Sequence, residues 1–213
     1  MYKDKLCPIT LPPNLTIVAT MNTSDQNVFT MDTAFQRRWQ MEHIPNKFDF
    51  KTAHVNKHLP KSEISWGAFA QIVNKKMHTA NLGFGGTEDK SLGVYFATDN
   101  DLDDAERFAE KVLKYLWDDA FKLGRKELFN DCSQGLSAVI EAYEDAAKAK
   151  IEKQSAEDPL KKVLVPAVYD EMQKKMAEMA AEAQAKAAKE VSEEEAAESA
   201  AEDNPAQKPA GEE

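Results

Sequence analysis

Residues with the chemistry of phosphoryl transfer follow a short apolar run near the N-terminus. The run covers 15–21 and ends at Asn22, and a helix expected over 31–38 closes with the pair Arg37 and Arg38. Phosphoryl transfer needs an oriented water and cations that neutralise the charge developing on the phosphate. Asn22 is therefore a candidate to orient the water, and the two arginines are candidates to stabilise the charge.

The elements expected to position these groups are a strand, a helix and a second strand. Residues 15–21 are largely β-branched and apolar, which is typical of a strand buried on both faces. Open α/β sheets bind ligands at the C-terminal end of such strands. A second strand is expected at 40–44. Because a parallel sheet needs further strands and covering helices, we expect an α/β fragment cut off at its N-terminal side.

Two sequence runs together resemble a known family of motors. MNTSD at 21–25 and AFQRRW at 34–39 resemble the sensor 1 and arginine-finger region of AAA+ proteins. They are most similar to the McrB type, the motor subunits of modification-dependent restriction systems. The resemblance is clear over residues 11–45 and extends more weakly to about Phe129.

The resemblance implies a role for each of five residues. Asn22 would be the sensor 1 residue, Asp25 would lie in the loop near the nucleotide, and Arg37 or Arg38 would reach into the next subunit's site. Lys90 is the candidate for the basic sensor 2 residue of the lid. The alternative is that the first two residues cap a turn, the arginines end a solvated helix and the lysine lies in a solvated loop.

The resemblance also implies what the complete protein would do. It would form a hexameric ring, hydrolyse ATP or GTP with Mg²⁺, drive a nuclease subunit of the McrC type and reach DNA only through the complete complex. The sequence has no GxxxxGK[ST] loop and no apolar strand that ends in Asp-Glu, so this chain alone is expected to bind no nucleotide and to be inactive. The glycine-rich run 83–91 is no substitute, because Asp89 and not a glycine precedes Lys90.

Composition divides the chain further. Every Trp and Phe lies between Phe29 and Phe129, and Ala, Glu and Lys dominate after residue 140. We therefore expect 1–46 to be the end of an α/β core, 47–130 to be a mainly helical lid, and 131–213 to be a charged helical tail, disordered at its end. A core needs large apolar side chains to offset chain entropy, so the last third is expected to build none.

Charge and ligand patterns exclude several classes of protein. The net charge of −10 lies almost entirely in the tail, and no basic stripe indicates a nucleic-acid domain. His54 and His58 have the i, i+4 spacing of a zinc pair, but no third ligand stands at metal spacing, so no metal site is expected. With no signal peptide, no membrane span and two unpatterned cysteines, we expect a cytoplasmic protein.

A second hypothesis is a non-enzymatic role. The chain would then be an adaptor or regulator that docks onto an AAA+ ring through its lid and helical tail. The stripe of Leu and Met residues over 160–179 suits contact with a partner helix.

Overall fold

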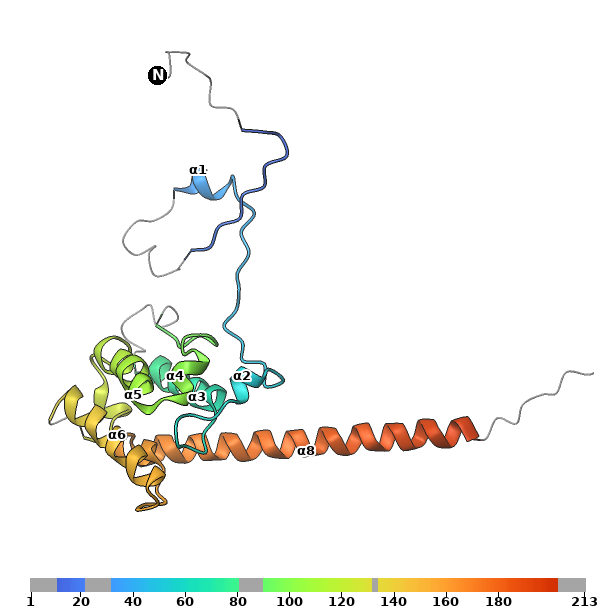
Figure 1. Ribbon diagram of the computed structural model, residues 1–213. Coiled ribbons are helices and arrows are strands. Elements are labelled where there is room, and N and C mark those ends of the chain that lie inside the picture. Colours follow the sequence, from blue (N-terminus) through green and yellow to red (C-terminus); the bar gives the residue numbers. More distant parts are fainter. Residues whose placement is uncertain (1–10, 22–31, 81–89, 132–133, 203–213) are drawn as a thin grey trace, which may run out of the picture. The chain divides into compact units, whose positions relative to one another are not determined.

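The computed structural model describes residues 11–21, 32–80, 90–131 and 134–202, with only the backbone of Ala80 and of 185–202 (Figure 1). The chain divides into two compact units, unit 1 over 1–43 and unit 2 over 44–213.

Unit 1 has one short helix among its described residues, α1 (Thr33–Gln36). Asp32 is its N-cap, and the carboxylate Oδ1 accepts a hydrogen bond from the Ala34 amide at 3.2 Å. The sequence predicted a helix over 31–38, and in the structure the helix begins after Asp32. Because an acidic acceptor satisfies one of the free amides of the first turn, Asp32 begins the helix instead of lying inside it.

The predicted α/β fold class is wrong. Residues 15–21 and 40–44 have no regular secondary structure, and the described part of the chain contains two isolated β-bridges but no strand or sheet. An extended segment becomes a stable strand only when neighbouring strands complete its backbone hydrogen bonds. The described residues supply no such neighbours. The apolar, β-branched pattern of 15–21 is therefore not enough to form a strand.

Unit 2 is built from helices and their connections. Its described elements are α2 (Ala53–Asn56), α3 (Trp66–Ala80), α4 (Asp99–Asp103), α5 (Ala105–Phe108), the π-helical η2 (Ala109–Leu113) and η3 (Leu116–Ala120), the 3₁₀ turn η4 (Arg125–Glu127), α6 (Leu136–Ile151), α7 (Pro159–Val163) and α8 (Pro166–Glu202).

Helix α3 lies at the centre of unit 2. Its apolar residues recur at spacings of three and four, as expected of a helix with one apolar face. The side chains of that face are completely buried: Trp66, Phe69, Ala70, Val73 and Met77. Their spacing of three and four residues places them on one side of the helix.

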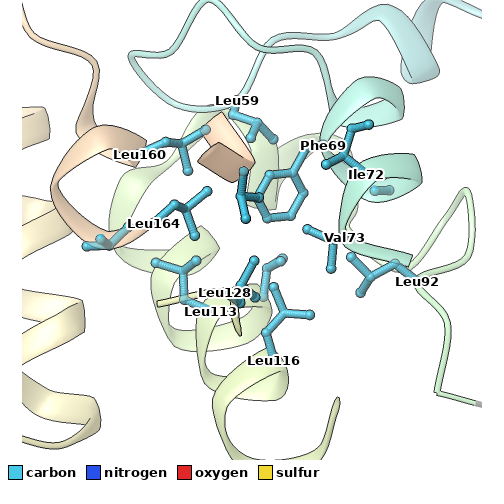
Figure 2. Close-up of a cluster of buried hydrophobic side chains, with 14 of the residues drawn as sticks. Leu59, Phe69, Ile72, Val73, Leu92, Leu113, Leu116, Leu128, Leu160 and Leu164 are labelled. Carbon is cyan, nitrogen blue, oxygen red and sulfur yellow. The ribbon is translucent and has the colours of Figure 1, made fainter. Parts of the chain in front are cut away.

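The hydrophobic core joins α3 to residues from nearly the whole of unit 2. Figure 2 shows Leu59, Phe69 and Val73 beside Leu113 and Leu116 of the following helices, with Leu160 and Leu164 closing the same cluster. Aromatic rings extend this core, since Phe108 lies between Phe69 at 5.7 Å and Tyr143 at 5.5 Å between ring centroids.

The prediction that the last third of the chain builds no core is wrong. The described residues after position 130 that belong to the buried hydrophobic core are Val139, Tyr143, Ala147, Leu160, Val163, Leu164, Val168, Tyr169 and Met172. They are few, but each of α6, α7 and α8 places its apolar residues on one face, so sparse apolar composition is enough. The predicted parts 1–46, 47–130 and 131–213 stay a prediction, although the core runs across residue 130.

Backbone hydrogen bonds join the two sides of residue 130. Phe129 and Leu164 form an isolated antiparallel bridge. The Asn130 amide donates to the Val163 carbonyl, and the Val165 amide donates to the Leu128 carbonyl, each at 2.9 Å. These bonds fix the start of α8 against the end of the preceding helical region.

The buried carboxylate of Asp158 ties the C-terminal helices to the loop before α3. It caps α7 by accepting from the Leu160 amide at 3.0 Å, and it also accepts from the Ser62 hydroxyl at 2.7 Å and the Glu63 amide at 3.1 Å. Nearby, the Tyr143 hydroxyl donates to the Pro60 carbonyl at 3.2 Å. A buried carboxylate needs such donors, so this contact fixes the register of α7 on the core.

Helix α8 packs on α3 through its first turns only. An ion pair joins Lys76 of α3 to Glu171, with Lys75 3.6 Å from the same carboxylate, and the hydrogen bond from Lys76 lowers the pKa of Glu171. Residues 181–184 are exposed, and the backbone stays helical to Glu202. The disorder expected at the end falls on 203–213, outside the described residues.

None of the helices in the described part of the chain combines the length and apolarity of a membrane span.

A capping box opens α4. Thr98 is the N-cap, and Asp101 is the third residue of the helix, which completes the box. One oxygen of Asp101, Oδ2, accepts from the Thr98 amide at 2.7 Å, the Thr98 hydroxyl at 2.8 Å and the Lys111 ammonium at 2.6 Å. Burial raises the pKa of Asp101, but these hydrogen bonds outweigh it and set the pKa at about 2.

Two truncations test whether the core crosses residue 130. A chain ending at residue 130 should show no cooperative unfolding transition, because it lacks Tyr143, Leu160 and Leu164, and each large core side chain stabilises by about 2–5 kcal/mol. A chain ending at residue 184 should melt within a few degrees of the full chain. Circular dichroism melting curves measure both, and a cooperative transition in the shorter chain would contradict this account.

The Asp101 contacts predict a specific pH dependence of stability. A carboxyl whose pKa is depressed from 3.8 to about 2 stabilises the fold above pH 4, and this stabilisation, about 2 kcal/mol at most, is lost as the pH falls toward 2. The difference in unfolding free energy between the wild type and Asp101→Asn should therefore shrink over that interval in urea titrations. Lys111→Met should remove part of the same difference, and a difference independent of pH would contradict the prediction.

Candidate functional site

The predicted catalytic residues of unit 1 fall into two groups. Asn22 and Asp25 lie outside the described residues. Arg37 and Arg38 are exposed at the end of α1, where Arg37 is the C-cap and the Arg38 guanidinium donates from Nη1 to the Ala34 carbonyl at 3.1 Å. Cations are favourable at a helix C-terminus, so these contacts explain the local structure. The catalytic roles stay predictions.

Lys90 is an exposed residue at the edge of the segment before Leu92. Its ammonium is 3.4 Å from the Asp119 carbonyl, and its own carbonyl accepts from the Tyr115 hydroxyl at 2.9 Å. Two residues later, the Asn74 side chain pairs with both backbone groups of Leu92, at 2.7 and 3.0 Å. The lysine therefore stands on a fixed backbone, and its nucleotide-binding role stays a prediction.

The two histidines at helical spacing do not meet. His54 Nδ1 is 2.7 Å from Asp99 Oδ1, and its Nε2 is 3.1 Å from the Val94 carbonyl. His58 is exposed and forms a backbone bridge with Ser65. No group of three or more His, Cys, Asp or Glu side chains in the described ranges could hold a metal ion.

The His54 contacts belong to a polar cluster that joins α2 to the start of α4. Lys57 donates from Nζ to Asp103 Oδ2 at 2.8 Å and to the Asp99 carbonyl at 3.1 Å. The hydrogen bond from His54 lowers the pKa of Asp99, and the hydrogen bond to Asp103 raises the pKa of Lys57. Sequence reasoning did not find this cluster, because more than 40 positions separate its two halves and no local pattern links them.

Unit 1 exposes large apolar side chains. We call these residues the unit 1 apolar surface, and between 45% and 87% of each is accessible to solvent: Leu11, Leu15, Ile17, Val18, Met21, Phe35 and Met41. Phe35 also contacts Trp39, with ring centroids 5.7 Å apart. The sequence identified residues 15–21 as apolar enough to be buried, but the described chain does not bury them. Seven exposed large apolar side chains among the described residues of one unit exceed the scattered ones ordinary on protein surfaces, and such an excess favours contact with another protein.

Unit 2 contrasts with unit 1 in this respect. Its large apolar side chains lie in the core, and those that the structure describes as exposed are scattered: Ile44, Tyr95, Leu123 and Ile151. Single exposed apolar residues are ordinary on protein surfaces. The candidate functional site is therefore the unit 1 apolar surface together with Arg37 and Arg38 at its helix end.

Comparison with known proteins places the chain beside a restriction enzyme. It is 34% identical over 147 residues to the "Type II restriction enzyme BsuMI component YdiS" of Bacillus subtilis (strain 168), a match that covers 67% of this chain and 40% of the relative. The chain thus spans less than half the length of this curated relative. No family model matches the chain, and no solved structure matches it.

These findings correct the resemblance read from MNTSD and AFQRRW. The comparisons support a likeness to a type II restriction enzyme component and do not support an AAA+ motor of the McrB type. The two runs are short, and the strand and sheet that would have placed them in an AAA+ core are absent from the described residues. The chain is similar to a component of a restriction system over two thirds of its length.

Proposed function

We propose that this chain is part of a restriction-system component and that unit 1 holds it to another protein of the complex. The observation that carries the proposal is the unit 1 apolar surface, seven large apolar side chains that the described chain leaves exposed. The similarity to a type II restriction enzyme component supplies the context. Unit 2 then acts as the folded body to which the docking segment is attached.

Charge supports contact with protein and not with DNA. Residues 1–43 carry four Lys or Arg and four Asp or Glu side chains, a formal net charge of zero, whereas DNA-binding surfaces gather Lys and Arg to neutralise phosphates. An apolar surface flanked by Arg37 and Arg38 has the composition of protein interfaces, in which large apolar residues and Arg are common. In this proposal DNA is reached only through other subunits.

Nucleotide use is a separate matter. ATP or GTP with Mg²⁺ was expected from the sequence for the complete protein, and no described residue tests it. The hexameric ring and the nuclease of the McrC type depended on the corrected resemblance, so neither is part of this proposal. The non-enzymatic alternative from the sequence placed docking on the lid and the helical tail. The assembly role proposed here differs from it, because it places the contact on unit 1.

A matched pair of isoleucines tests the docking role. Ile17 of unit 1 and Ile151 of α6 have the same exposure, 58%. Ile17→Asn should weaken binding to the partner about tenfold or more, because burial of an isoleucine contributes about 1.5–3 kcal/mol, and Ile151→Asn should not. The measurement is the affinity for each protein encoded beside this chain's gene, after co-expression and purification of the full chain.

The outcomes separate cleanly. Retention of one of those proteins by the wild type and by Ile151→Asn, but not by Ile17→Asn, supports the proposal. Equal retention by both variants would exclude unit 1 as the docking segment. Failure of the wild type to retain any of the neighbouring proteins would contradict the assembly role itself.

A further inference from the structure

His54 lies between two hydrogen-bond acceptors. Its imidazole, which is 12% exposed, has Asp99 Oδ1 at 2.7 Å from Nδ1 and the Val94 carbonyl at 3.1 Å from Nε2. A carbonyl oxygen can only accept, and an ionised carboxylate can only accept. A neutral imidazole has a single N–H and can satisfy one of these partners. Both bonds exist together only when both ring nitrogens carry a proton.

The surroundings favour the doubly protonated ring. Asp99 and Asp103 supply two carboxylates, and Lys57 supplies one ammonium, 3.7 Å from Asp99 Oδ1 and 2.8 Å from Asp103 Oδ2. A charged His54 brings this group of four to a net charge of zero, and a neutral ring leaves one negative charge without a counterpart. The imidazole also stacks on the Tyr95 ring, with centroids 5.4 Å apart, and an aromatic face attracts a cation.

We propose that His54 is a proton-operated latch that fastens the first turn of α4 to α2. With the proton present, one side chain holds Asp99 at the start of α4, Val94 in the preceding turn and the Tyr95 ring at the surface. With the proton absent, the latch opens on the Asp99 side.

The geometry determines which contact is lost. The Val94 carbonyl also accepts from the Trp66 indole at 2.6 Å, and Trp66 is completely buried, so Val94 cannot withdraw. Asp99 is 65% exposed and can turn toward water. A neutral ring therefore keeps its proton on Nε2 for Val94 and presents a lone pair on Nδ1 to the carboxylate. The repulsion at 2.7 Å releases Asp99 and loosens the first turn of α4.

The sign of the effect follows from this arrangement. The contact is strongest where His54 is charged and Asp99 is ionised. It weakens as the pH rises and the ring loses the proton that one of its two acceptors requires. It also weakens in strong acid, where the carboxylate of Asp99 becomes protonated.

NMR titration of the full chain, labelled with ¹⁵N, tests the latch. Ring ¹⁵N spectra should show both nitrogens of His54 protonated at low pH and Nε2 alone protonated at high pH. The backbone amides of Asp99 and Asn100 should shift with the same midpoint as the ring. His58→Gln is the matched control, since His58 is exposed and lies four residues away, and it should leave both changes intact.

Two variants separate the latch from simple packing. His54→Gln should abolish the pH-linked shift of the Asp99 amide, and its melting temperature should fall below that of the wild type by about 2–4 °C at pH 5 and by less at pH 8. Asp99→Asn keeps the bond to Val94 but removes the carboxylate, so it should also abolish the shift, and it serves if His54→Gln does not fold. An unchanged pH-linked shift of the residue 99 amide in either variant, or a wild-type His54 ring carrying a single proton at pH 5, would overturn the proposal.

Discussion

Unit 2 depends on the closure of one hydrophobic core by apolar side chains from both halves of its sequence. Helix α3 supplies the centre, and Leu160, Leu164 and Met172 cover it from the C-terminal side. Large apolar side chains from both halves bury α3. The buried carboxylate of Asp158 also links the two halves by hydrogen bonds, because its donors Ser62 and Glu63 lie nearly a hundred residues earlier. Apolar burial supplies the stability, and the carboxylate restricts how the C-terminal helices can be placed.

This core also positions the polar cluster around His54. Trp66 is buried in α3, and its indole holds the Val94 carbonyl, to which the His54 ring is also bonded. The turn between Leu92 and Ala97 is therefore attached to the centre of the fold. The first turn of α4 begins from that turn, which is why a single imidazole can influence a helix start 45 residues away. The wide π-helical turns of η2 and η3 follow in the same region and bury Val112, Leu113 and Leu116.

The sequence predicted those parts of the fold that depend on local periodicity. The buried face of α3 was recognisable because five apolar residues recur at helical spacing. The role of the C-terminal helices was missed because few apolar residues suffice when each lies on the correct face, as Tyr143 does. The strand at 15–21 failed for a different reason, since its composition is that of a strand but pairing requires neighbours that composition does not reveal. The contacts of His54 and Asp158 had no local signal, because their partners are 40 to 96 positions away.

The two units differ in how far they bury their large apolar side chains. Unit 2 buries most of its large apolar side chains in its own core, whereas the described part of unit 1 leaves its large apolar side chains exposed. We therefore expect unit 1 to associate with another protein. Hydrogen exchange of residues 14–21 measures this most directly, in the chain alone and in its purified complex with a neighbouring restriction protein. The account predicts that exchange in this segment slows in the complex, while exchange in α3 is unchanged. Equal exchange of residues 14–21 in both samples would contradict the claim that unit 1 is the docking segment.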